Sequence, residues 1–140
     1  MSLEGKLKGK VAVITGGNSV IGLATAELFH REGAKVAIFG RDPSTLDGAA
    51  RRIGAEVVTV QGAIRRIDYL NRLYEVVGAR LGPIDVLVAN AGIAKFAPLD
   101  DYPEALFDEI SDINFKGAFF TVIRAVHAPR WRFGGARRRL

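Results

Sequence analysis

Residues 11–22 read VAVITGGNSVIG. An apolar run enters a glycine-rich turn, and apolar residues then recur at helical spacing as far as Phe29. This pattern predicts a buried strand, a tight loop and the start of a helix. Unpaired backbone N–H groups at a helix N-terminus bind phosphate, and glycine lets a ligand approach the backbone closely. We therefore interpret the segment as a nucleotide-binding strand–turn–helix.

The chain has 140 residues, of which 49% are hydrophobic, and this suits one domain with one core. No stretch approaches the ~18 apolar residues that would span a bilayer, and the charged segment 1–10 does not resemble a signal peptide. Cysteine is absent, which excludes disulfides and zinc–thiolate sites and is typical of a reducing cytosol. His30 and His127 have no second ligand at metal spacing. We expect a cytoplasmic protein without a membrane partner or a metal site.

The formal net charge of +5 arises at one end of the chain. Residues 128–140 contain five arginines and no acid, whereas residues 1–127 hold fifteen basic and fifteen acidic side chains. A clustered basic tail can bind polyanions non-specifically, but a solvated, disordered end is the simpler interpretation. We expect a folded domain over 1–127, a disordered basic tail over 128–140 and no specific nucleic-acid partner. A reading-frame change or simple divergence would each account for the tail.

Strand and helix patterns alternate along the domain. Strands are predicted at 11–15, 35–39, 56–60 and 84–89, and helices at 20–31, 43–53, 67–81, 105–110 and 114–126. Asp101 and Glu104 have the spacing of a capping box before the fourth of these helices. Continuous apolar strands between helices indicate a parallel sheet covered on both faces. Right-handed crossovers then predict a doubly wound α/β fold of about four strands in the order 3-2-1-4, with a ligand crevice at the carboxyl ends of strands 1 and 4.

The glycine turn alone would also fit an ordinary turn, but three further features accompany it. Residues 40–42 read GRD after the second strand, residues 90–92 read NAG after the fourth, and Asn114 lies in the segment INFKG. Together, and in this order, they resemble the short-chain dehydrogenase/reductase family over residues 8–127. The resemblance implies a Rossmann-like fold that is truncated to the cofactor-binding half of the family.

The resemblance also implies a role for each motif. In the family the glycine turn holds the pyrophosphate of NAD or NADP, and the Asn-Ala-Gly segment supports the turn and lines the adenosine side of the crevice. Asn114 corresponds to the asparagine of a catalytic proton-relay network that also uses a serine, a tyrosine and a lysine. The implied cofactor-binding residues are Gly16, Asn18, Ser19, Val20, Ile21, Gly22, Arg41, Ala63, Ile64, Asn90, Ala91 and Gly92.

Arg41 bears on the choice of cofactor. A carboxylate at the end of the second strand would bond to the ribose 2′-hydroxyl of NAD, but Gly40 stands at that position and Arg41 follows. A guanidinium suits a 2′-phosphate, so the resemblance favours NADP(H), with NAD as the alternative. Another interpretation of Arg41 is a surface residue that pairs with Asp42.

Three departures from the family pattern affect binding and catalysis. Val20 replaces the middle glycine of the turn and predicts weaker cofactor binding, by about 1–3 kcal/mol if the loop must shift. Ala63 replaces an aspartate that contacts adenine, at a cost of roughly 1 kcal/mol. The family's Tyr-x-x-x-Lys pair is absent, because four positions after the tyrosines at 69, 74 and 102 come Leu, Gly and Leu. No serine matches the catalytic one.

The sequence therefore supports two hypotheses from different classes. The first is an NADP(H)-dependent oxidoreductase of the family that is catalytically incomplete in this chain. The second is a non-catalytic cofactor-binding or interaction module, for example a partner of a full-length homologue; a non-functional truncated product is a further alternative. An exposed fourth strand and an uncovered last helix would also favour self-association.

Overall fold

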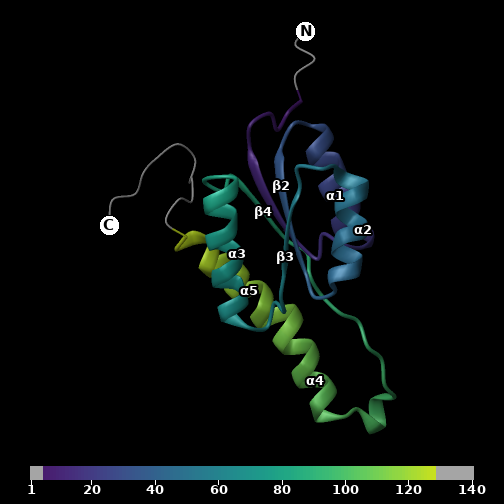
Figure 1. Ribbon diagram of the computed structural model, residues 1–140. Helices are drawn as coiled ribbons and strands as arrows, with labels where there is room; N and C mark the ends of the chain where they lie inside the picture. The colour runs from purple at the N-terminus through teal and green to yellow at the C-terminus, as the bar shows by residue number, and fades with distance from the viewer. Residues whose placement is uncertain (1–4, 129–140) are drawn as a thin grey trace.

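A parallel four-stranded sheet with helices on both faces forms the protein (Figure 1). The computed structural model describes residues 5–128. The strands are β1 (Val11–Thr15), β2 (Lys35–Gly40), β3 (Val58–Gln61) and β4 (Val86–Ala89). They lie in the order β3-β2-β1-β4, and each neighbouring pair is parallel. The predicted doubly wound α/β topology and its strand order are confirmed.

Strands β3 and β4 both begin two residues later than predicted. Before β4, Asp85 lies against the start of β1, where its carboxylate accepts a hydrogen bond from the Val11 N–H at 2.9 Å. The Asp85 N–H donates to the Val11 carbonyl oxygen, also at 2.9 Å. The regular ladder with β1 then starts at the pair Ala12 and Val86, after Asp85 has bonded to Val11 once through its backbone and once through its side chain.

Each face of the sheet is covered by two helices (Figure 1). The helices α1 (Val20–Arg31) and α2 (Pro43–Ile53) cover the face onto which Ala12 and Ile14 of β1 point, with α1 over β1 and β2 and α2 over β2 and β3. The helices α3 (Ile67–Arg80) and α5 (Ala118–Val126) cover the other face, where Val11 and Val13 point. Every residue of β1 is buried, because alternate side chains enter opposite halves of the core.

The last helical run is continuous rather than two separate helices. The helix α4 (Glu104–Ser111) passes into η2 (Asp112–Gly117), which has π-helical hydrogen bonding, and then into α5. The predicted capping box is wrong. Asp101 belongs to a short 3₁₀ turn, η1 (Leu99–Asp101), and Pro103 occupies the N-cap of α4 without a side-chain cap. A cap by Asp101 would need the helix to begin at Tyr102, but the residue before a proline is kept out of the helical region, and Tyr102 is extended.

The run from α4 to α5 extends past the carboxyl ends of the strands (Figure 1). A long connection from β4 through η1 leads to it. Within residues 5–128 no helix combines the length and the apolar character that crossing a bilayer requires. The tail predicted over 128–140 lies outside the described residues, except for Ala128.

Candidate functional site

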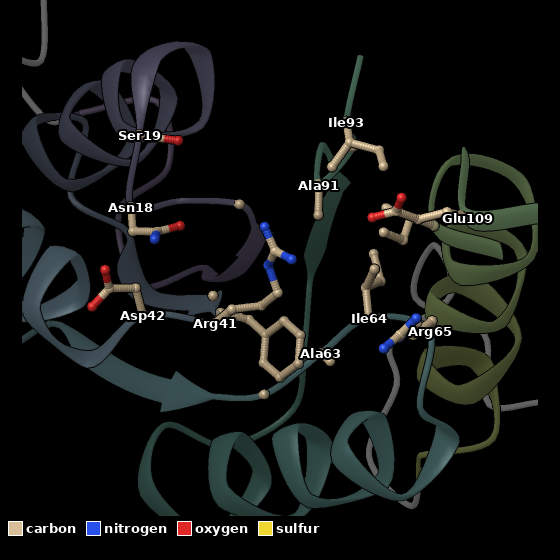
Figure 2. A pocket seen from close by; sticks show the side chains of 16 residues that line it. Asn18, Ser19, Arg41, Asp42, Ala63, Ile64, Arg65, Ala91, Ile93 and Glu109 are labelled. Carbon is tan, nitrogen blue, oxygen red and sulfur yellow. The ribbon is translucent and has the colours of Figure 1, made fainter. Parts of the chain in front are cut away.

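A cavity of about 450 Å³ opens at the carboxyl ends of the strands (Figure 2). The crevice was predicted at strands 1 and 4, and the cavity extends from there along the ends of β2 and β3. It is lined by the segments that follow the strands and by Glu109 of α4 and Ile113 of η2. The predicted site residues among its lining are Gly16, Asn18, Ser19, Arg41, Ala63, Ile64, Ala91 and Gly92. Val20, Asn90 and Asn114 do not line the cavity, but each adjoins a lining residue in the chain. Gly22 lies against the lining residue Gly16, whereas Ile21 is exposed and lies outside the lining.

The glycine turn between β1 and α1 is closely packed. Gly16 has a φ of +67°, in the left-handed region that favours glycine. A Cβ atom on Gly22 would collide with the Gly16 carbonyl oxygen, so the first turn of α1 can lie against the loop only without a side chain there. The cradle is thus shaped by missing Cβ atoms, as expected where backbone N–H groups meet a phosphate.

Val20 is strained within this turn. Its φ is +45°, and no other non-glycine residue of the described chain has a positive φ. A β-branched residue in that region is a rare and costly conformation. The Val20 side chain is 82% exposed and does not line the cavity. The departure from the family pattern is therefore visible as backbone strain, at the N-terminus of α1.

Thr15 connects the glycine turn to the segment after β4, a role that the sequence did not predict. The fully buried hydroxyl of Thr15 accepts hydrogen bonds from the N–H groups of Asn90 and Ala91, each at 3.1 Å. The Asn90 amide in turn donates to the carbonyl oxygens of Thr15 at 3.2 Å and Gly16 at 3.4 Å. These bonds agree with the supporting role that the resemblance implies for Asn90.

Asn114 lies in the π-helical segment η2 and faces the connection after β4. Its Oδ1 accepts a hydrogen bond from the Ile93 N–H, and its Nδ2 donates to the Ile93 carbonyl oxygen, both at 2.8 Å. The side chain thereby fixes Ile93, a lining residue, against the helix. Single π-helical turns within α-helices are frequent at functional sites.

Asp42 caps a helix instead of pairing with Arg41. Its Oδ1 accepts hydrogen bonds from the backbone N–H and the hydroxyl of Ser44, both at 2.8 Å, at the N-terminus of α2. These bonds hold the pKa of the Asp42 carboxyl below its ordinary value. In the described chain no ion pair joins Asp42 to Arg41, whose guanidinium lies between Asn18 and Ala91 in Figure 2.

Gly40 provides room for a neighbouring amide. A Cβ atom at this position would lie 2.6 Å from Oδ1 of Asn18. Asn18 is held there because its Nδ2 donates a hydrogen bond of 2.7 Å to the Thr45 hydroxyl. The missing side chain at the end of β2 and the position of Asn18 are therefore coupled.

Two charged residues of this region were not singled out from the sequence. Lys95 Nζ lies 2.8 Å from each carboxylate oxygen of Glu109, and this pair ties the connection after β4 to α4. The bond from Lys95 holds the pKa of Glu109 below its ordinary value, and the charges of Arg65 and Arg41 act in the same direction. Lys95 and Glu109 are fourteen residues apart, and no local sequence pattern indicates that they meet.

The tyrosines do not form a catalytic acid in this cavity. Tyr74 of α3 is buried, and its hydroxyl donates a hydrogen bond of 2.6 Å to the Thr121 carbonyl oxygen in α5. Burial raises the pKa of this phenol, the opposite of what a proton donor at neutral pH needs. Tyr69 packs beside Arg66, with the guanidinium carbon 5.2 Å from the ring centre. Neither phenol lines the cavity.

No group of three or more His, Cys, Asp or Glu side chains that could hold a metal gathers within residues 5–128. The cavity lining instead combines backbone amides, guanidinium groups and two carboxylates, of which Asp42 is bound to Ser44 and Glu109 to Lys95. Such a lining suits an anionic organic ligand with phosphate groups.

Comparisons with known proteins agree with this architecture. The family model described as short chain dehydrogenase matches residues 10–133. "Oxidoreductase asL5" of Sarocladium schorii is 40% identical over 136 residues, which are 97% of this chain and 55% of that protein. The "NADP-dependent (R)-specific alcohol dehydrogenase" of Lentilactobacillus kefiri is 38% identical over 117 residues, with 82% of this chain and 46% of that protein covered.

A crystal structure described as a short-chain dehydrogenase/reductase (glucose/ribitol dehydrogenase) from Brucella melitensis superposes with a TM-score of 0.85 at 30% identity. The superposition covers 90% of this chain and 54% of that one. The chain thus spans about half the length of the curated relatives that it matches. Because the family model covers most of the sequence and the sheet has the expected topology, the chain belongs to the short-chain dehydrogenase family.

Proposed function

We propose that this chain binds NADP(H) in the cavity, as the cofactor-binding part of an oxidoreductase that moves hydride between NADP(H) and a carbonyl or alcohol. One observation carries the proposal. Gly40 stands at the end of β2, where an acid would favour NAD, and the guanidinium of the next residue, Arg41, lines the cavity. A 2′-phosphate matches a guanidinium, whereas a ribose hydroxyl would match an acid. The NADP-dependent relative from Lentilactobacillus kefiri supports this preference over NAD.

The residues present fit a dinucleotide. Backbone N–H groups of the glycine turn would hold the pyrophosphate, because Gly16 and Gly22 leave the cradle free of Cβ atoms. The segments containing Ala63–Ile64 and Ala91–Gly92 would contact adenosine, and Arg41 its 2′-phosphate. When bound, the nicotinamide supplies or accepts the hydride. Arg41 and the turn bind and orient the cofactor, whereas the side chain of Ala63 offers no hydrogen bond to adenine.

We propose further that this chain alone does not complete the reaction. The sequence holds no Tyr-x-x-x-Lys, and Tyr74, the phenol with the raised pKa, serves as a packing residue. Asn114, the one member of the catalytic set that is present, bonds to Ile93. Cytoplasmic location stays a prediction from the composition.

The decisive test is calorimetric titration of the purified chain with NADPH and NADH, beside a reductase assay on a generic diketone. We expect binding with preference for NADPH, a raised melting midpoint and no turnover. Arg41→Asp should shift the preference toward NADH, whereas Arg66→Asp, an equal charge change outside the cavity, should leave it unchanged. Lack of association with either cofactor would refute the binding proposal. Sustained turnover by a homogeneous preparation would refute the proposal that this chain alone does not complete the reaction.

A second candidate function is an interaction module for full-length relatives. It is favoured by large apolar side chains that are exposed along the helical run from α4 to α5: Phe107, Phe115, Phe119, Val122 and Val126. Melting with excess homologue discriminates the two functions, because a partner that binds only the folded chain raises the midpoint. A shift with homologue and none with NADPH would favour the interaction module. A shift with neither would indicate a non-functional product.

A further inference from the structure

Two arginines line the cavity without a partner of their own. Arg41 follows β2, and Arg65 follows β3. Figure 2 shows them on two sides of the cavity, with Ala63 and Ile64 between them. Both are exposed, and within residues 5–128 neither guanidinium makes a hydrogen bond or an ion pair.

The carboxylates of the same wall are engaged elsewhere. Asp42 is held by Ser44 at the start of α2, and Glu109 is held by Lys95 through both of its oxygens. Arg65 and Arg41 lie near enough to Glu109 for their charges to lower its pKa, yet the direct contact goes to Lys95. The cavity wall therefore retains two positive charges that no neighbouring acid compensates by contact.

We infer that Arg65 is a second specificity-determining residue, which acts with Arg41 on the 2′-phosphate of NADP(H), and that Lys95 keeps Glu109 from opposing it. This inference rests on the proposed function. A dianionic phosphate gains from a guanidinium that has no ion pair to break, because no competing interaction is lost on binding. NAD(H) has no phosphate at that position and gains nothing from Arg65.

The chain supplies a matched control in the next residue. Arg66 binds Asp68 at 2.9 Å, is exposed like Arg65, and does not line the cavity. Arg65→Gln and Arg66→Gln therefore remove the same charge from adjacent positions. Only the first removes a guanidinium that faces the cavity.

The test is a set of calorimetric titrations with NADPH and with NADH on the full chain and on these two variants. We expect Arg65→Gln to weaken NADPH binding about tenfold or more and to change NADH binding less than about twofold, since one charge-assisted contact is lost. Added salt should weaken NADPH binding to the unmodified chain more steeply than to Arg65→Gln. Arg66→Gln should bind both cofactors as the unmodified chain does.

A second pair of variants tests the part assigned to Lys95. Lys95→Gln should weaken NADPH binding, because the freed Glu109 carboxylate would pair with Arg65 and repel the phosphate. Adding Glu109→Gln to that variant should restore the affinity. Melting midpoints without ligand verify that each substitution leaves the fold intact.

Each outcome decides the inference. If Arg65→Gln weakened the binding of NADPH and of NADH equally, the side chain would act on adenine or on the fold. That result would overturn the inference. So would identical behaviour of Arg65→Gln and Arg66→Gln. In either case the proposed function survives if the unmodified chain prefers NADPH and Arg41→Asp abolishes that preference. Failure of the unmodified chain to bind either cofactor overturns both.

Discussion

Val20 concentrates the strain of the glycine turn in a single residue. The φ of +45° places a β-branched side chain in a region that only glycine enters at low cost. Val20→Gly should raise the free energy of unfolding by about 1 kcal/mol, as urea denaturation would show, because the strain is relieved. NADPH should also bind more tightly to the variant.

Val20→Ala separates the two causes of that gain. Alanine keeps the Cβ atom, and so most of the backbone strain, but lacks the two methyl groups of valine. The glycine variant should therefore exceed the alanine variant in stability. Equal stability of the two variants would show that the size of the side chain, rather than the sign of φ, causes the strain. Weaker NADPH binding by Val20→Gly would show that the loop does not need a glycine at this position to bind the cofactor.

Thr15 is the residue on which the contact between the turn and β4 depends. Thr15→Val preserves the shape of the side chain but removes the acceptor for the Asn90 and Ala91 N–H groups. Leaving these part-buried donors unpaired should lower the free energy of unfolding by about 1–3 kcal/mol in urea denaturation. Thr15→Ser retains the hydroxyl and should lose less; a larger loss in the serine variant would contradict the role given to the hydroxyl.

The packing of α3 on α5 depends on one phenol. Tyr74→Phe removes the 2.6 Å hydrogen bond to the Thr121 carbonyl oxygen and should cost about 1 kcal/mol at neutral pH. Because the pKa of Tyr74 is raised in the folded state, the unfolded chain loses its proton first when pH rises above the ordinary value near 10. Stability should therefore fall above about pH 10.

Denaturation curves from pH 8 to about pH 11 check this pH dependence, with Tyr74→Phe beside the unmodified chain. The variant should lack the part of the alkaline loss that Tyr74 causes, so its curve should be flatter than that of the unmodified chain. Parallel curves for the two proteins would assign the alkaline loss to other groups.

Considered as a whole, the molecule carries an unpaired sheet edge and an uncovered helix. β4 is an outer strand of the sheet, and the residues of β4 retain partial exposure. On α5, Phe119 is 54% exposed and Val122 is 45% exposed. Apolar surface of this kind drives association in water, so we predict concentration-dependent oligomers in sedimentation velocity.

A charge on that surface should oppose the association. Val122→Lys should shift the sedimentation profile toward the monomer, because pairing would bury an ammonium group. Asn71→Lys introduces the same charge at an exposed position of α3 and should leave the profile unchanged. Equal effects of the two variants would trace any change to net charge rather than to this face.

Sequence periodicity alone determined the sheet, its strand order and the position of the crevice, because strand and helix patterns are local and parallel crossovers have one hand. The glycine turn was predicted from its residue types, and the role of the Asn-Ala-Gly segment from the resemblance to the family. The element boundaries were predicted less accurately. Pro103, rather than Asp101, is the N-cap of α4, and a π-helical turn joins two helices that were predicted as separate.

Only the tertiary structure decided which charges meet. The pairing of Lys95 with Glu109 and the approach of Thr15 to Asn90 depend on distances between segments that lie apart in the chain. A sequence gives the number of acids and bases but not which of them neutralise each other, since an ion pair forms only where folding brings two groups within a few ångströms. Among the described residues, Arg41 and Arg65 have no ion-pair partner at the cavity because the nearby carboxylates, Asp42 and Glu109, bond to Ser44 and Lys95 instead.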